Sequence, residues 1–316
     1  MRKTLHKRIL TLQEINRRAV QDPKGFVEEE EHRYATEVTE LSKLLVEDMD
    51  DRCLIMLAGP SSSGKTTTAG MLCSELQRNG VDAHVISLDD FYRGRRQAPQ
   101  LADGSYDYEA LEALNLEQLR CCMKELLQDG ISQIPVFDFL TGSPAEQKRE
   151  LRIGHNSAVI FEGIHALNPI FEQHLPQENL YKVFINTMTA IYDGEMKLLA
   201  RRQLRLVRRL LRDARFRNSP PDNTLQMWQQ VVRGENLYMF PYVDTVDYAI
   251  DTTHAYEPCV FTKELLSLLG ELPKNDPFIA TAEQLQSAIH QFEPLPTSLV
   301  TCHSMLREFI GNDDCD

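Results

Sequence analysis

One eight-residue pattern constrains this chain more than any other feature of its sequence. Residues 59–66 read GPSSSGKT, which has the form G-x-x-x-x-G-K-[ST]. A short apolar run at 54–58 precedes the pattern, and a stretch of helical character at about 65–78 follows it. An apolar run ended by glycine is typical of a buried parallel strand. Strand, loop and helix in this order are the context in which the pattern forms a phosphate-binding loop, or P-loop.

The residue types explain how such a loop would hold a nucleoside triphosphate. Gly59 and Gly64 permit backbone angles that turn successive N–H groups toward one point, where no side chain blocks a phosphate. The following helix directs the positive end of its dipole at the same point. Lys65 would reach the β- and γ-phosphates, and the Thr66 hydroxyl would hold Mg²⁺. The predicted ATP-binding residues are Gly59, Ser61, Ser62, Ser63, Gly64, Lys65, Thr66 and Thr67.

Alternating strand and helix signals predict the fold class. Strand-like runs lie at 54–58, 83–88, 134–139, 158–161, 181–185 and 248–250, and helical patterns at 65–78 and 108–128. This alternation indicates an α/β fold, a mostly parallel sheet of the P-loop NTPase type with helices on both faces. The ligand crevice of such a sheet lies beyond the carboxyl ends of its strands.

The chain divides into three parts on composition. Residues 1–50 form a helical, acidic N-terminal extension, whose run of four glutamates at 28–31 is typical of a solvated face or a linker. Residues 51–252 form the predicted core, with an arginine-rich helix at about 201–217. Residues 253–316 form a helical tail that prolines interrupt.

Composition excludes several classes of protein. The net charge of −13 argues against general affinity for nucleic acid or an anionic membrane, and no apolar run approaches the roughly 18–20 residues of a membrane span. The seven cysteines include no Cys-x-x-Cys and suggest neither a disulfide framework nor a zinc site. Without an apolar signal-peptide segment, the cytoplasm is the expected location. The sequence leaves the oligomeric state open, a homo-oligomer included.

Acidic residues follow two of the predicted strands. Asp89 and Asp90 come directly after the run at 83–88, so at least one of them is expected at the crevice. A kinase needs such a carboxylate to accept the proton of the acceptor hydroxyl and to steady the metal ion. Glu162 ends the run at 158–161 and has the form of a second carboxylate on the metal side. The alternatives are loop or helix-capping roles for these acids.

The segment 201–217 holds eight arginines and one acid, Asp213, and therefore carries a charge of +7 within an acidic chain. Several of these arginines share one face of a helix, where like charges at i, i+4 repel one another by roughly 0.2–0.5 kcal/mol per pair. This repulsion implies that an anion outside the segment offsets its positive charge. One interpretation is a lid that closes over phosphates. The alternatives are a solvated basic face, a docking site for the acidic N-terminal extension, and an RNA-binding stripe, which the scarcity of nearby aromatic residues disfavours.

Taken together, these motifs resemble those of the uridine kinase/phosphoribulokinase family. The residues that carry the resemblance are the P-loop, SLDDFY at 87–92, PVFDF at 135–139, FEGI at 161–164 and RRLLRD at 208–213. Later stretches, RGE at 233–235, FPY at 240–242 and REFIG at 307–311, look like the bacterial nucleoside-kinase branch of that family. The resemblance covers roughly residues 53–311.

The resemblance implies transfer of the γ-phosphoryl group of ATP to the 5′-hydroxyl of a nucleoside, with uridine as the inherited first candidate. It implies Asp89 as the general base and Thr66, Glu162 and Asp89 as the residues on the Mg²⁺ side. Arg209, Arg212 and Arg217 match lid positions that meet phosphates. The implied acceptor-binding residues are Asp107, Tyr92, Phe137 and Phe139, with Glu112 as a rival to Asp107 for the ribose hydroxyls.

Two positions depart from the family pattern. Uridine/cytidine kinases place a Tyr and a His around the pyrimidine, where this chain has Phe137 and Gly142. Without these two polar groups, the site cannot distinguish bases by hydrogen bonds to them. Hydrogen bonds of this kind give an enzyme its strongest discrimination between similar substrates. Two alternatives therefore remain, a P-loop kinase of another small hydroxylated metabolite, such as a sugar phosphate or a vitamin precursor, and a non-catalytic ATP-binding regulator.

Overall fold

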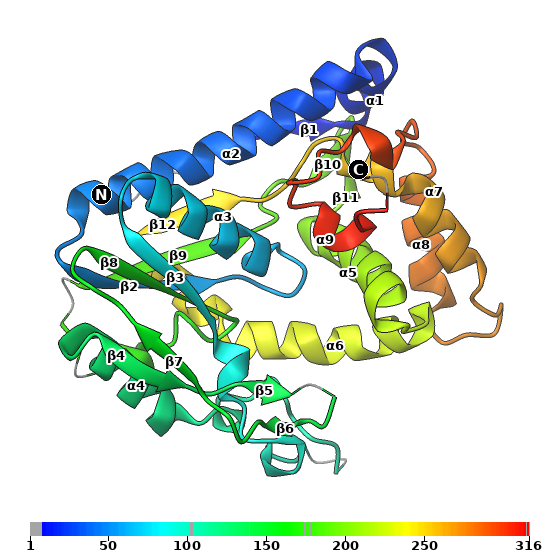
Figure 1. Cartoon of the computed structure of the whole chain (residues 1–316). Helices are drawn as coiled ribbons and strands as arrows, with labels where there is room; N and C mark the ends of the chain where they lie inside the picture. The colour runs from blue at the N-terminus through cyan, green and yellow to red at the C-terminus, as the bar shows by residue number, and fades with distance from the viewer. Residues whose placement is uncertain are drawn as a thin grey trace.

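A five-stranded parallel sheet carries the P-loop in the computed structural model, which describes residues 8–101, 104–138, 140–173, 175–176, 179–313 and 315. Its strands are β2 (Arg52–Ala58), β3 (Asp82–Ser87), β8 (Ser157–Glu162), β9 (Leu180–Asn186) and β12 (Tyr248–Asp251). They lie in the order β12-β9-β2-β8-β3, and every neighbouring pair is parallel (Figure 1). The predicted parallel sheet is thus confirmed.

Helices cover both faces of this sheet, as expected. Cys53, Ile55 and Leu57 of the central strand β2 pack into the same apolar cluster as α2 (Pro23–Asp48) and α3 (Lys65–Arg78). The alternate residues Leu54 and Met56 pack with α4 (Leu116–Gln128) instead. Successive side chains of a strand point to opposite faces, so a strand buried on both sides must be apolar at every position.

The helix predicted at 108–128 begins later than expected. The Asn115 side chain accepts a hydrogen bond from the backbone N–H of Gln118 at 3.2 Å and caps α4. Residues 108–115 form turns instead, including a short 3₁₀ segment, Leu111–Ala113. A capping asparagine satisfies N–H groups that the first helical turn leaves free. The apolar spacing upstream of Asn115 therefore belongs to a loop that faces the crevice.

The strand predicted at 134–139 lies outside the parallel sheet. Strand β4 (Ile131–Ile134) pairs antiparallel with β7 (Arg149–Arg152), and β5 (Phe137–Asp138) pairs antiparallel with β6 (Ser143–Pro144). Pro135 has no N–H to donate to a ladder, which accounts for the break between β4 and β5. Phe139 lies outside the described residues.

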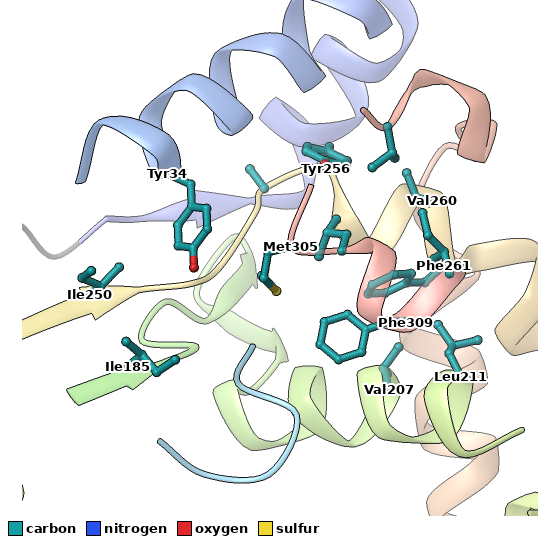
Figure 2. Packing of buried hydrophobic residues seen from close by; sticks show 14 of the residues in the cluster. Tyr34, Ile185, Val207, Leu211, Ile250, Tyr256, Val260, Phe261, Met305 and Phe309 are labelled. Atoms are coloured by element: carbon teal, nitrogen blue, oxygen red, sulfur yellow. The ribbon is translucent and has the colours of Figure 1, made fainter. Parts of the chain in front are cut away.

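Both terminal extensions are helical, as expected, and they pack on the core. The N-terminal extension contains α1 (Leu12–Gln21) and α2, whose first turn is capped by Asp22 and begins with Pro23. The C-terminal tail contains α7 (Glu257–Gly270), α8 (Ile279–Ile289) and α9 (Arg307–Ile310). Apolar residues of both extensions share one buried cluster with strand β2. Figure 2 shows part of it, with Tyr34 of α2 above Met305 and Phe309 of the tail.

Short strands and two further α-helices complete the described strands and α-helices. Strand β1 (Leu10–Thr11) pairs parallel with β10 (Ile191–Asp193), which pairs antiparallel with β11 (Met196–Leu199). Helices α5 (Arg201–Arg217) and α6 (Pro221–Tyr238) follow. Within the described ranges, none of the helices combines the length and apolar composition that a membrane span requires.

Two expectations about the extensions need correction. In the run of four glutamates, Glu30 is buried rather than solvated: it accepts hydrogen bonds from Arg33 at 3.4 Å and from the backbone N–H of Ala255 at 3.1 Å. Although the cysteines suggested no disulfide framework, Cys302 and Cys315 form one disulfide, with their Cα atoms 5.6 Å apart. In each case the chain fold supplies a partner that the local sequence does not reveal.

Candidate active site

The P-loop connects β2 to α3, and its two glycines serve different purposes. Gly64 has a φ of +86°, in the left-handed region that glycine adopts without strain. Gly59 is needed for a close approach, because a Cβ atom there would lie 2.5 Å from the backbone oxygen of Ile185 on β9. The loop is therefore held directly against the neighbouring strand of the sheet.

The centre of the loop is suited to an anion. The hydroxyls of Ser62 and Ser63 are buried, and neither has a hydrogen-bond partner among the described residues. Unpartnered buried polar groups cost free energy, so such groups in a loop at a helix N-terminus indicate a ligand that would satisfy them. The Lys65 ammonium donates at 3.5 Å to the backbone oxygen of Pro60 at the edge of the same loop. These groups together fit a phosphate chain.

Two adjacent acids after β3 point in different directions. Asp90 accepts a hydrogen bond from the Phe137 backbone N–H at 3.3 Å and supports the loop of β5. Asp89 lies in the P-loop crevice, where burial first and the nearby Glu162 carboxylate second raise its pKa to about 6, while Lys65 opposes the shift. A carboxyl with such a pKa is poised for proton transfer near neutral pH.

Glu162 lies at the end of β8, opposite Ser87 in the register of the sheet. Its buried carboxylate accepts hydrogen bonds from the hydroxyls of Ser87 at 2.9 Å and Thr66 at 3.4 Å. Hydroxyl and carboxylate oxygens are the ligands that Mg²⁺ prefers, usually alongside substrate phosphates. No cluster of three or more His, Cys, Asp or Glu residues in the described part of the chain could hold a metal without such help. The residues present therefore fit a Mg²⁺ ion that is bound together with a nucleotide.

The arginine-rich helix α5 packs on the P-loop. Arg209 donates to the Ser61 hydroxyl at 2.9 Å and to Asp213 at 3.1 Å, and Arg212 donates to Glu308 at 3.0 Å. Arg217 forms an ion pair with Asp213 at 3.1 Å and is about half exposed. Arg209 thus contacts the P-loop directly, and Arg212 is linked to Thr67 through Glu308. Arg217 shares the carboxylate of Asp213 with Arg209.

Two further arginines of α5 form buried ion pairs that the sequence analysis did not predict. Arg205 makes a bidentate pair with Glu235 of α6, at 2.7 and 2.8 Å, and Arg208 makes one with Glu257 of α7, at 2.6 and 2.9 Å. Both guanidinium groups also donate to P-loop carbonyl oxygens, of Ser61 at 2.9 Å and Ser62 at 3.4 Å. The anions implied by the arginine run are therefore contributed by other helices of the tertiary fold. Arg205 and Arg208 are buried, so the alternative of a solvated basic face is wrong for these two residues.

Acidic residues at 107–112 include the two that the sequence analysis predicted as rivals for the acceptor. Asp107 is buried and forms an ion pair with Arg233 of α6 at 2.8 Å, whereas its rival Glu112 is exposed. Between them in sequence, Glu109 has a pKa raised to about 7, mainly by burial and further by the Asp89 carboxylate. Sequence reasoning missed Glu109, since no motif marks it.

Tyr92 and Phe137, two of the three aromatic residues predicted for the acceptor, lie beside each other. The rings of Tyr92 and Phe137 pack edge to face, with centroids 5.7 Å apart. Gly142 adjoins the side chain of Arg95, because a Cβ atom at Gly142 would lie 2.5 Å from the Arg95 Cδ atom. The Arg95 side chain therefore lies beside Gly142, one of the two positions at which the family pattern has a polar residue.

A buried histidine is a second residue that the sequence analysis missed. Neither ring nitrogen of His165 has a hydrogen-bond partner of normal geometry among the described residues, and burial lowers the pKa of its imidazole to about 4. Its ring lies 5.7 Å from that of Tyr238, on the same helix as Arg233. His165 is therefore neutral at pH 7, and it lies beside the helix that carries Arg233.

The raised pKa of Asp89 predicts the pH dependence of the proposed reaction. A general base must be deprotonated, and a carboxyl with a pKa of about 6 loses that form as the pH falls below 6. We expect kcat/KM to level off above about pH 7 and to fall about tenfold per pH unit well below pH 6. Steady-state rates from pH 4.5 to 8.5 measure the profile. Glu109→Gln is the control, and its kcat/KM should still fall below pH 6. A profile flat down to pH 5 would contradict the assignment of Asp89.

Comparison with known proteins shows which proteins this chain is similar to. The sequence pattern of the family described as "Phosphoribulokinase / Uridine kinase family" matches residues 54–256, more than half of the chain. A protein of Mycoplasma genitalium named uridine kinase is 30% identical over 186 residues, 58% of this chain and 78% of that one. A uridine kinase of Deinococcus deserti is 28% identical over 184 residues, 58% of this chain and 79% of that one.

Among solved structures, the phosphoribulokinase of Rhodobacter spheroides superposes with a TM-score of 0.40 at 14% identity, over 65% of this chain and 74% of that one. The family match spans the P-loop, both crevice carboxylates Asp89 and Glu162, and the arginine helix α5. The chain belongs to the phosphoribulokinase/uridine kinase family of P-loop kinases.

Proposed function

We propose that this protein transfers the γ-phosphoryl group of ATP to the 5′-hydroxyl of a nucleoside, with uridine as the first candidate. The observation that carries the proposal is the position of Asp89. Its carboxyl group lies near Lys65 of the P-loop and near Glu162, in a crevice that α5 borders with arginines. A base beside a phosphate cradle is the arrangement that phosphoryl transfer to a hydroxyl requires.

In the proposed mechanism, P-loop amides and Lys65 bind the phosphates of ATP. Thr66, Glu162 and Asp89 would hold Mg²⁺, which neutralises charge on the β- and γ-phosphates when bound. Asp89 orients the acceptor hydroxyl and takes its proton as the new O–P bond forms and the bond between the γ-phosphorus and the β-phosphate oxygen breaks. Arg209, Arg212 and Arg217 would stabilise charge on the transferring group.

The ribose is assigned to Asp107 in this proposal. Its carboxylate is buried and already oriented by Arg233, so it could accept hydrogen bonds from sugar hydroxyls without further ordering. Glu112 is the weaker choice because it is exposed. Tyr92 and Phe137 supply the aromatic surface against which a base could pack.

The base is the least constrained part of the acceptor. The names of the relatives favour uridine. The apolar Phe137 and the Arg95 side chain beside Gly142 favour a second candidate, a P-loop kinase whose acceptor is another hydroxylated metabolite, such as a sugar phosphate. A guanidinium group suits an anionic acceptor, because it binds phosphate in a bidentate manner.

An acceptor screen tests the proposal. The protein is incubated with ATP and Mg²⁺ and with uridine, cytidine, purine nucleosides, sugar phosphates or vitamin precursors, and ADP release is measured together with the phosphorylated product. We expect the highest kcat/KM with uridine. A preference for an anionic sugar would favour the second candidate. ATP binding without phosphorylation of any acceptor would contradict both and favour a non-catalytic regulator.

A further inference from the structure

The C-terminal segment, residues 301–311, lies against the P-loop, although the matched family pattern covers only residues 54–256. A Cβ atom at Gly64 would lie 2.6 Å from the Met305 sulfur, so this methionine contacts the loop backbone. Figure 2 shows Met305 and Phe309 between helix α2 and helix α5. A segment more than 230 residues downstream therefore forms one wall of the P-loop environment.

This segment is held rigidly. Met305, Leu306 and Phe309 are completely buried. The buried Arg307 side chain donates hydrogen bonds to backbone oxygens on both sides of it, those of Thr297, Val300, Thr301 and Gly311. The Phe309 ring lies 5.2 Å from the guanidinium carbon of Arg208, which itself reaches the P-loop. The backbone that carries Glu308 is therefore fixed in position.

Glu308 uses this fixed position to join two predicted nucleotide-binding residues. One carboxylate oxygen accepts a hydrogen bond from the Thr67 hydroxyl at 3.1 Å, and the other accepts one from Arg212 at 3.0 Å. The side chain of Glu308 is 20% exposed, so the ion pair is only partly screened by water. The carboxylate thus connects the first turn of α3 to the arginine helix α5.

The remaining contacts of Arg212 show what Glu308 contributes. The Arg212 Nε group is buried and has no hydrogen-bond partner among the described residues, and its distance to Asp213 is 3.7 Å. Glu308 is therefore the group that fixes the direction of this guanidinium. An arginine has five N–H donors, so one bond to Glu308 leaves others for a phosphate. Donors that are already oriented stabilise charge without reorganisation during the reaction.

We propose that Glu308 is a positioning residue of the nucleotide site, which holds Arg212 and Thr67 in the orientation that binds the phosphates of ATP. The inference rests on the proposed function, because it assumes that ATP occupies the P-loop. It adds to the site a residue that lies beyond residues 54–256, the range of the matched family pattern. The C-terminal segment then has a role in ATP affinity as well as in packing.

The test compares Glu308→Gln with the wild type and with Glu264→Gln. Glu264 is a matched control, since it pairs with Arg215 of the same helix at 3.3 Å and, unlike Glu308, does not bridge α5 to Thr67. ATP affinity is measured by titration calorimetry without an acceptor, and kcat and KM are measured separately. We expect Glu308→Gln to weaken ATP binding about tenfold, because a charge-assisted hydrogen bond becomes a neutral one. Glu264→Gln should bind ATP as the wild type does.

A mutant cycle separates positioning from general destabilisation. If Glu308 acts by holding Arg212 and Thr67, then Glu308→Gln should add little to the defect of Arg212→Met/Thr67→Ala, in which both partners are absent. Additive losses, or ATP binding by Glu308→Gln that equals or exceeds that of the wild type, would overturn the inference. Tighter binding would mean that the carboxylate competes with phosphate. A wild type that binds no ATP would instead contradict the proposed function.

A second variant covers the case in which Glu308→Gln does not fold. Arg212→Lys keeps the positive charge but loses the planar donor pair that Glu308 orients. It should weaken ATP binding by a similar factor, and wild-type affinity in this variant would equally overturn the inference.

Discussion

Replacement of Asp89 by asparagine is expected to lower kcat by about 10²–10⁴-fold, the usual contribution of a positioned general base. The amide has nearly the shape of the carboxyl group but cannot take the proton of the acceptor hydroxyl. ATP binding measured without Mg²⁺ should be retained or should tighten, because the variant removes a negative charge from a crevice that also contains Glu162. Rapid-quench turnover and ATP titration measure the two effects separately.

The adjacent residue is a matched control for this experiment. Asp90→Asn removes the same charge one position along the chain, from a side chain that accepts a hydrogen bond from the Phe137 backbone. An amide oxygen can accept the same bond, so turnover should stay close to that of the wild type. Near-wild-type kcat in Asp89→Asn, or equal losses in the two variants, would show that Asp89 is not the base.

Replacement of Arg208 by methionine is expected to destabilise the fold by about 3–5 kcal/mol, because it leaves a buried carboxylate without its partner. Arg208 and Glu257 are both completely buried. Burial already raises the pKa of Glu257, and the nearby Arg208 opposes that rise. Without the guanidinium group, Glu257 must take up a proton or remain an unpaired buried charge. Urea unfolding monitored by circular dichroism measures the loss.

Two further variants test whether burial of the ion pair causes the loss of stability expected for Arg208→Met. Arg215 of the same helix pairs with Glu264 and Asp313 at a more exposed site, so Arg215→Met should cost less than about 1 kcal/mol. In the double variant Arg208→Met/Glu257→Leu, apolar side chains replace both charges, and much of the lost stability should return. A loss in Arg208→Met no greater than in Arg215→Met would contradict the argument.

Much of the candidate site was predictable because its signals are local. The P-loop pattern depends on contiguous residues and on the strand and helix beside them. Parallel strands place their carboxyl ends on one edge of the sheet, so acids that directly follow two strands were expected to meet there. Asp89 and Glu162 do meet there. Helical periodicity likewise indicated the arginine helix α5, whose bounds, Arg201–Arg217, agree with the predicted segment.

Errors in the sequence analysis occurred where a local pattern had more than one explanation. The apolar spacing at 108–128 fits a helix throughout, yet the asparagine cap at Asn115 divides it into a loop and α4. The run at 134–139 has the composition of a strand, but composition does not specify which sheet a strand joins. Strand pairing depends on partners such as β7, which lie elsewhere in the sequence.

By itself, the sequence determined the class of fold, the phosphate cradle and the acids at its edge, because each of these follows from neighbouring residues. Only the tertiary structure decided which carboxylate meets which arginine. Arg205 pairs with Glu235, Arg208 with Glu257 and Arg212 with Glu308, across separations of 30, 49 and 96 residues. Those separations carry no periodic signal, so burial and chain topology alone bring the partners together and complete the site.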